Sequence, residues 1–254
     1  MKQGSAATKL RSIAHVESWA AVICDPDGDR LLRLGACQDD TIIPAALRRR
    51  LGAYGRMAVS CGLSVTTERD SDIVFCSRHG DMELATRLLN DLAQHAPLSP
   101  AGFSLSVHNA VPGVMDLARQ SRAGHTAIAG GSQSLSAGIT EAWTRLAERH
   151  EGAVSLVYAD CSIRGLYAEF ADASFGDMAL AMTLTARTGD VGAARLALKS
   201  QPSAGPDNGC LLEPTSEELA RLMIGILSEQ TQQEVLWRSH GLEWTFAMAP
   251  DASA

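Results

Sequence analysis

The sequence predicts an α/β protein in which strands and amphipathic helices alternate. The runs VSLVYAD at 154–160 and MALAMTLTA at 178–186 are short, mostly apolar and typical of buried strands. The segments ELATRLLNDLAQH at 83–95 and ITEAWTRLAERH at 139–150 instead repeat their apolar residues at helical spacing. No internal repeat or low-complexity tract interrupts this alternation. A sheet covered by helices is therefore expected.

The elements before residue 104 follow from the same two patterns. Residues 43–65 have helical spacing, which Gly52 and Gly55 weaken. The segment DIVFCSRHG at 72–80 indicates a strand that enters a turn. The helix predicted after it is expected to end at SPAGF, residues 99–103.

The C-terminal third is expected to contain one more strand, a loop and a last helix. ARLALK at 194–199 is a strand candidate, and the glycine- and proline-rich segment 200–210 is typical of a flexible loop. Thr215 and Glu218 have the spacing of a capping box, which predicts a helix that continues to about Leu227.

Length and composition indicate one folded unit. A chain of 254 residues, 46% of them hydrophobic, can bury one sizeable core, so we expect a single domain over 1–254 with a disordered tail at 249–254. The net charge of -7 argues against nucleic-acid binding, which needs a surplus of Lys and Arg. No apolar run is long enough to span a membrane, so the expected location is the cytoplasm.

The cysteines suggest neither a metal site nor a disulfide framework. There is no CxxC pair and no nearby histidine at ligand spacing, so we expect no metal, no cofactor and mostly buried, reduced thiols. The six cysteines are Cys24, Cys37, Cys61, Cys76, Cys161 and Cys210.

The stretch GHTAIAGGSQSLSAGITEAW, residues 124–143, predicts a short strand, a glycine-rich corner and a helix. This geometry holds the nucleophile in many α/β enzymes, but Gln133 stands at the corner here. A hydrolase with Ser132 as nucleophile would have Asp160 and His240 in the expected order, although GGSQS lacks the second glycine of GxSxG. The glycines could also serve only close packing of helix on strand. A phosphate cradle would need a lysine or the GxGxxG spacing.

Residues 99–142 resemble the part of β-ketoacyl synthases that leads into the active-site cysteine. An alignment without gaps from Gly124 puts Gln133 on the position of that cysteine. Further segments resemble a small ketosynthase-like family that occurs in aryl polyene gene clusters. These segments are SWAA (18–21), RRRLGAYGRMA (48–58), FCSRHGD (75–81), SVHNA (106–110) and LVYAD (156–160).

The resemblance implies a thiolase-like, ketosynthase-type fold, essentially its N-terminal half, with the second half missing or reduced. A glutamine amide cannot form the thioester that condensation requires. The histidines that the second half of a ketosynthase supplies are expected to be missing as well. The resemblance therefore implies a non-catalytic subunit like the chain length factor of type II polyketide systems. Such a subunit would complete a heterodimer with an active β-ketoacyl synthase, shape its acyl tunnel for an aryl polyene pigment, and meet the acyl carrier protein only indirectly.

The same resemblance implies the site residues. The strand within 124–131 would lie at the dimer interface, and Gln133 near the partner's pocket, where its amide could hydrogen-bond instead of react. Gln133 could equally be a polar filler of the corner, and His108 with Asn109 a turn whose side chains bond backbone groups. The remaining alternative is an enzyme, a small hydrolase using Ser132 or an acyltransferase using a cysteine, Cys161 first. The expected tunnel or interface residues are Phe103, Ser106, His108, Asn109, Met115, Ser132, Gln133 and Ser134.

Overall fold

The computed structural model describes most of the chain. The described residues are 11–24, 30–66, 71–148, 152–171, 176–186, 194–199, 213–229, 233–239 and 241–248. The loop expected at 200–210 and the tail expected at 249–254 both lie outside the described residues.

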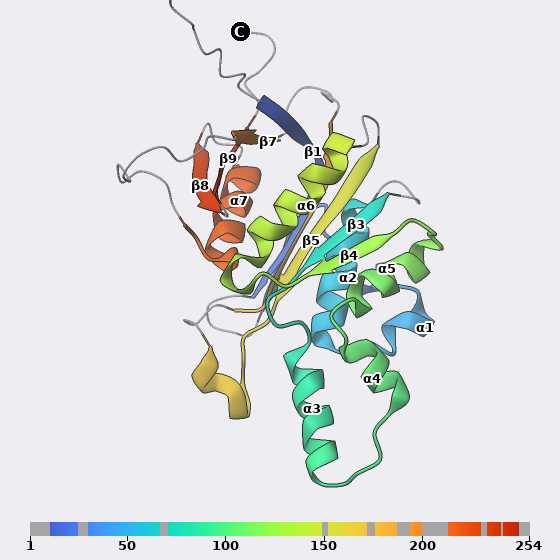
Figure 1. Cartoon of the computed structure of the whole chain (residues 1–254). Helices are drawn as coiled ribbons and strands as arrows, with labels where there is room; N and C mark the ends of the chain where they lie inside the picture. The colour runs from blue at the N-terminus through green and yellow to red at the C-terminus, as the bar shows by residue number, and fades with distance from the viewer. Residues whose placement is uncertain are drawn as a thin grey trace, which may run out of the picture.

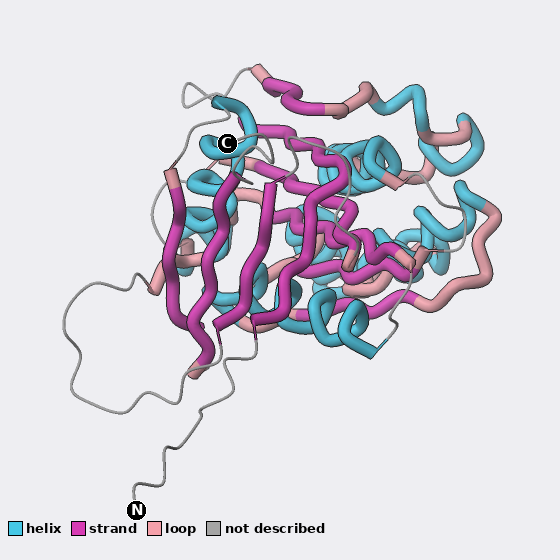
Figure 2. Tube along the Cα trace, turned by 90° about the horizontal axis from the view of Figure 1, so that it is seen from above, coloured by secondary structure: helices cyan, strands magenta, loops and turns pink. Residues whose placement is uncertain are grey.

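The described strands form one mixed sheet in the order β4-β3-β5-β6-β1-β7-β9-β8. β2 pairs with the C-terminal part of β1, from Ala20 to Cys24. Figure 2 shows them as one continuous twisted layer. β3, β4 and β5 are parallel, whereas all other pairs are antiparallel. The strands are β1 (Arg11–Cys24), β2 (Leu31–Gly35), β3 (Asp72–Cys76), β4 (His125–Ile128), β5 (Ala153–Asp160), β6 (Met178–Thr185), β7 (Ala194–Lys199), β8 (Glu234–Ser239) and β9 (Leu242–Met248).

Helices cover both faces of the sheet, while α3 and α4 extend away from it (Figure 1). The α-helices are α1 (Ala45–Arg48), α2 (Ala53–Val65), α3 (Met82–Ala93), α4 (Pro100–Ser106), α5 (Ala110–Arg119), α6 (Ser134–Glu148) and α7 (Ser216–Glu229). The short 3₁₀ helices are η1 (Asp40–Ile42), η2 (Gly131–Gln133) and η3 (Gly165–Phe170).

Two cores lie on opposite faces of the sheet, because neighbouring strand residues point to opposite sides. In β5, Leu156 belongs to the core under α6 and α7, whereas Val157 belongs to the core under α2 and α5. All residues of β5 are buried, as its largely apolar sequence predicts for a strand covered on both sides. The first core continues to β8 and β9, where Trp237 stacks on Trp244 with ring centroids 5.9 Å apart.

Most predicted elements are confirmed, but two differ. The helix expected over 43–65 is divided into α1 and α2, because Gly52 has an extended backbone and is the N-cap of α2. The prediction that SPAGF ends a helix is wrong. Ser99 instead caps the start of α4, since its Oγ accepts a hydrogen bond from the Gly102 N–H at 3.1 Å, and Pro100 occupies the first turn.

Four further strands, β1, β2, β8 and β9, had no counterpart in the prediction. β1 is central, since it pairs with β6 along one edge and with β7 and β2 along the other. β8 and β9 form a hairpin at the end of the sheet. Beyond β6, the described chain thus adds only β7, α7, β8 and β9, which agrees with a reduced second half.

Candidate functional site

The corner between β4 and α6 is built as the sequence predicts. β4 ends at Ile128, and Gly131 has a φ of +61°, in the left-handed region that favours glycine. Ser134 is completely buried: its Oγ accepts a hydrogen bond from the Gly130 N–H (3.0 Å) and donates one to the Gly131 carbonyl (2.8 Å). Ser134 therefore closes the corner by satisfying its backbone groups.

Gln133 lies half-buried at the end of η2, and its side chain is engaged within the chain. Its Oε1 accepts a hydrogen bond of 2.6 Å from the hydroxyl of Ser239, a buried residue at the end of β8. This contact joins the corner to the far edge of the sheet. An amide in this arrangement accepts a hydrogen bond and offers no nucleophile.

A second serine fastens the corner to α7. The Ser216 Oγ accepts a hydrogen bond from the Leu135 N–H (3.0 Å) and donates one to the Ser132 carbonyl (2.9 Å). Sequence reasoning missed both Ser216 and Ser239. No local signal could have identified them, because they lie 81 to 106 residues from the atoms that they bond.

The hydrolase constellation is not assembled among the described residues. Ser132 is exposed at the corner, and His240 lies outside the described residues. The Asp160 carboxylate accepts hydrogen bonds from the Ser77 Oγ (2.8 Å) and from the Arg78 N–H, 3.0 Å from each oxygen. Asp160 is therefore engaged in the turn that follows β3.

His108 and Asn109 belong to the turn between α4 and α5. The His108 Nε2 lies 3.1 Å from the Ile128 carbonyl oxygen, and its ring lies 5.7 Å from that of Phe75. His108 therefore joins this turn to the end of β4, in the side-chain-to-backbone manner expected of an HN turn. Asn109 is exposed, and as the N-cap of α5 it makes no side-chain capping bond.

The remaining expected tunnel residues are not brought together. Phe103 is 61% exposed on α4, and the Ser106 hydroxyl donates to its carbonyl at 2.9 Å. Met115 is completely buried on α5, facing α2 where Gly62 leaves room for it. A Cβ on Gly62 would lie only 2.5 Å from the Met115 Cε. A tunnel role for these residues stays a prediction.

The buried cysteines are poor candidates for acyl transfer. Burial, with the nearby carboxylate of Asp177, raises the pKa of Cys161 well above its ordinary value. Burial raises the pKa of Cys76 in the same direction. Cys161 is only half-buried and borders a cavity of about 600 Å³ between α3 and residues 161–166, so it is accessible. The nucleophile of a thioester exchange is the thiolate, which these surroundings disfavour.

β4 is an edge strand whose outer side is open. Among the described residues it pairs with β3 alone. The Gly124 carbonyl accepts from the Ile73 N–H (3.3 Å), and the Ile128 carbonyl accepts from the Ser77 N–H (3.1 Å). Because backbone groups alternate along a strand, the N–H and C=O groups of the odd-numbered residues, such as Ala127, point to the open edge.

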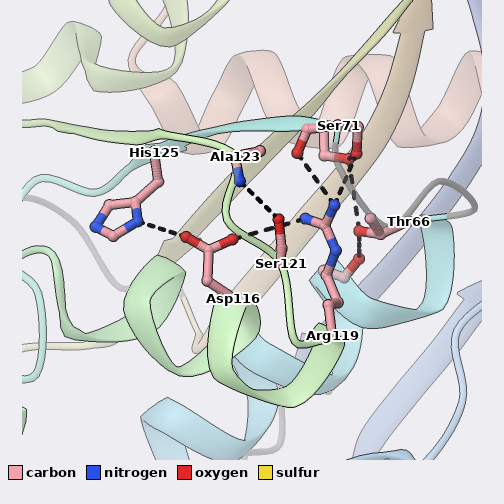
Figure 3. Close-up of polar contacts among 9 residues, drawn as sticks. Thr66, Ser71, Asp116, Arg119, Ser121, Ala123 and His125 are labelled. Atoms are coloured by element: carbon pink, nitrogen blue, oxygen red, sulfur yellow. Dashed lines mark hydrogen bonds and ion pairs between the residues drawn. The ribbon is translucent and has the colours of Figure 1, made fainter.

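A polar cluster fixes the start of this edge strand (Figure 3). The His125 Nδ1 lies 2.7 Å from the Asp116 Oδ2 on α5. Arg119, one turn later on α5, donates to both the carbonyl and the hydroxyl of Ser71 at 3.1 Å, just before β3. The cluster therefore holds α5, β3 and β4 together beneath the open edge.

Apolar side chains remain exposed on the helices next to β4. Leu117 on α5 is 64% exposed, and Val107 in the preceding turn is 42% exposed. Together with Phe103 they form the apolar surface of α4 and α5, and α5 also contacts β4. Exposed apolar surface next to an open strand edge is typical of a protein interface.

The described residues contain neither a metal-binding cluster nor a membrane-spanning helix. Within the described ranges, no group of three or more His, Cys, Asp or Glu side chains is placed to hold a metal ion. None of the helices in those ranges is both long enough and apolar enough to cross a membrane.

Comparison with known proteins gives similar structures and one family. No curated protein matches the sequence. A ketosynthase (ApeO) in complex with its chain length factor (ApeC) from Xenorhabdus doucetiae contains a chain 24% identical, with a TM-score of 0.70 over 92% of this chain and 98% of that chain. The ishigamide ketosynthase/chain length factor is 12% identical, with a TM-score of 0.60 over 92% and 98%.

A β-ketoacyl synthase from Burkholderia phymatum is 13% identical, with a TM-score of 0.53 over 87% of this chain and 71% of that chain. These similarities establish the fold, which is the thiolase-like fold of ketosynthases. The family described as beta-ketoacyl synthase, N-terminal domain, matches residues 32–246, most of the chain. The protein therefore belongs to the β-ketoacyl synthase N-terminal domain family.

Proposed function

We propose that this protein is a non-catalytic, chain length factor-like subunit that pairs with an active β-ketoacyl synthase in type II polyketide biosynthesis, in a pathway for aryl polyene pigments. The observation that carries the proposal is Gln133, whose amide oxygen is hydrogen-bonded to Ser239 at the corner where a ketosynthase would hold its cysteine. In this proposal the chain is a single domain that acts through its interface and not through a reactive group.

The chemistry of the corner supports this role. An amide forms no thioester, so the chain would carry no acyl intermediate at Gln133. Ser132, Gln133 and Ser134 each take part in hydrogen bonds that hold the corner in shape. In the proposed dimer this rigid corner stands next to the partner's pocket and helps to form the wall of the acyl tunnel.

The similar structures also favour a partner subunit. Two of them contain a ketosynthase with a chain length factor. In the complex from Xenorhabdus doucetiae, the matched chain has nearly the same length as this one, since 92% of this chain covers 98% of that chain. A ketosynthase-type chain of this reduced size thus occurs within a two-subunit complex. The acyl carrier protein would then be received mainly by the active partner.

The edge strand β4 suggests how the subunits meet. A partner strand placed beside β4 would bond the outward N–H and C=O groups of Ala127 and continue the sheet across the interface. The apolar surface formed by Phe103, Val107 and Leu117 would be covered at the same time. The cluster around His125 would keep the edge rigid during docking.

Co-purification tests this interface. The full chain is co-expressed with the ketosynthase of the same gene cluster, one subunit tagged, and the product is analysed by size-exclusion chromatography with light scattering. We expect a one-to-one complex. Ala127→Pro removes an outward N–H group and should abolish the complex, whereas Ala127→Val keeps that group and should preserve it. The proposal would be contradicted if both variants formed the complex. It would also be contradicted if the parent chain and both variants all failed to form it.

A further inference from the structure

We propose that Cys37 and Cys61 form a reversible thiol–disulfide pair that is oxidised by hydroperoxides. Cys37 follows the end of β2 and Cys61 lies in the middle of α2, and neither belongs to the corner that holds Gln133 or to β4. It is therefore a modification site that is independent of the proposed subunit role.

Cys61 holds the inner position of the pair. It is completely buried on the face of α2 that packs against β1, and its thiol donates a hydrogen bond of 3.3 Å to the Ala20 carbonyl. Ala20 is the cross-strand partner of Gly35, the last residue of β2. Cys61 therefore lies beneath β1, and the chain that leaves β2 is held to the same strand by the hydrogen bond of 2.9 Å from the Ala36 N–H to the Trp19 carbonyl.

Cys37 holds the outer position of the pair. It follows β2 by two residues, is only half-buried, and packs on the hydrophobic core that contains Cys61. The next residue, Gln38, donates its N–H to the Ser64 Oγ at 2.9 Å, and Ser64 lies one helical turn after Cys61 on α2. The segment that carries Cys37 is thus fastened to the same helix face as Cys61.

The surroundings of the two thiols shift their pKa values in opposite directions. The neighbouring Cys61 thiol lowers the pKa of Cys37, against the opposing effect of partial burial, and the charge of Arg33 and the Ser64 hydroxyl act in the same direction as Cys61. Burial raises the pKa of Cys61 well above its ordinary value. A thiolate that is accessible and has a thiol beside it is the arrangement in which peroxide oxidation leads to a disulfide.

The proposed reaction consumes one hydroperoxide and two thiols. The Cys37 thiolate attacks the terminal peroxide oxygen and the O–O bond breaks; a solvent proton completes the leaving water or alcohol, and Cys37 becomes a sulfenic acid. The Cys61 sulfur then attacks the Cys37 sulfur, so that the S–S bond forms, the S–O bond breaks, and the Cys61 proton leaves with the oxygen as water. Both sulfurs are oxidised and the peroxide is reduced. A dithiol reductant reverses the change.

The other described cysteines provide internal comparisons. Cys24 and Cys76 are buried, and Cys161 is accessible but has a raised pKa. Because only the thiolate reacts, and the pKa of Cys37 is lowered whereas that of Cys161 is raised, Cys37 should alkylate faster than Cys161 at neutral pH. Cys210 lies outside the described residues, so it is replaced by serine in every protein tested.

The test uses the full chain carrying Cys210→Ser. The protein is treated with increasing hydrogen peroxide, its remaining thiols are blocked with N-ethylmaleimide, and it is digested with trypsin without reductant for mass spectrometry. Cys37 and Cys61 fall in the tryptic peptides 34–48 and 57–69. We expect these peptides to become linked at lower peroxide than any other cysteine is modified, and dithiothreitol to separate them. Cys161→Ser should leave this linkage unchanged.

A second variant keeps the inference falsifiable. Cys61→Ser or Cys61→Ala, whichever retains the parent circular dichroism, should abolish the linkage and leave a Cys37 sulfenic acid that dimedone traps. If both variants unfold, Cys37→Ser, at the half-exposed position, should leave the Cys61 thiol unmodified. Modification of Cys161 before Cys37, or oxidation of Cys37 in the parent chain without linkage to Cys61, would overturn the inference.

Discussion

Asp160→Asn should destabilise the protein strongly, because Asp160 organises the turn after β3 from a buried position. The residue is 3% exposed at the end of β5. Its carboxylate accepts from the Ser77 Oγ (2.8 Å) and the Arg78 N–H (3.0 Å), with the His79 N–H at 3.3 Å. An asparagine of the same shape replaces one acceptor oxygen by an NH₂ group and removes the charge that strengthens the remaining bonds.

The expected cost follows from these contacts. A hydrogen bond to a charged group contributes about 1.5–3 kcal/mol, and a buried donor left without its acceptor costs about 1–3 kcal/mol. The bonds share one carboxylate and are not additive, so we expect Asp160→Asn to lower the free energy of unfolding by about 2–4 kcal/mol. Asp177→Asn is the matched control. Its carboxylate bonds the Ser162 N–H and the 69% exposed Arg164 side chain, so its loss should cost about 1 kcal/mol or less.

Urea unfolding followed by tryptophan fluorescence and far-ultraviolet circular dichroism measures both variants. The midpoint for Asp160→Asn should fall well below that of Asp177→Asn, with an unchanged dependence on urea. A loss below about 1 kcal/mol for Asp160→Asn, or equal losses for the two variants, would refute the reasoning about the buried carboxylate.

Three further predictions concern the corner, the core and α3. A double-mutant cycle of Gln133→Ala and Ser239→Ala should give a coupling of about 0.5–1.5 kcal/mol in urea unfolding, and additive effects would deny their bond. Gly138→Ala should lower the melting temperature, because the added Cβ would lie 2.6 Å from the Cys76 Sγ, and a rise would contradict this packing. Burial raises the pKa of Asp81, the N-cap of α3, so the charged carboxylate opposes folding. The contribution of Asp81 to stability therefore falls as the pH rises from the pKa of the unfolded state through the higher pKa of the folded state. Asp81→Asn, which keeps the cap, should therefore gain stability over the parent as pH rises from 4 to 7 in thermal unfolding, and a constant difference would contradict the raised pKa.

The parts of the fold that were predicted from sequence have signals within a few residues of each other. β5 is mostly apolar, and buried throughout, because the sheet is covered on both faces there. The start of α7 follows from the capping box, in which the Thr215 N–H donates to the Glu218 Oε2 at 2.8 Å. In both cases the residues that form the sequence pattern are also the residues that make the contacts of the strand or helix.

Other elements depend on distant partners or on a signal with two meanings. β1 contains a register irregularity between Val16 and Ser18, which breaks its alternation, and its place in the sheet is set by three other strands. The sequence predicts a helix end at Ser99 and Pro100, although serine before proline is also a strong signal for a helix start. Context beyond the segment decides between the two.

The candidate site was predictable only in part. The strand, the glycine corner and Gln133 are adjacent in sequence, so a local pattern identified them. The bond from Ser239 to Gln133 joins residues 106 positions apart, and the pairing of β8 at the far end of the sheet creates it. Cys37 likewise reaches the core that contains Cys61 only when the chain after β2 is fastened to α2 by the hydrogen bond from the Gln38 N–H to the Ser64 Oγ. Such pairings are properties of the folded chain.

The most direct test of the proposed role is a condensation assay with malonyl-loaded carrier protein and the co-purified ketosynthase, with and without this chain. The subunit role predicts that the ketosynthase is active only in the complex and that Gln133→Ala leaves complex assembly intact. It also predicts that the isolated chain turns over no ester and is not labelled by a serine-directed phosphonate. A ketosynthase that is equally active without this chain, or an isolated chain that hydrolyses esters through Ser132, would contradict it.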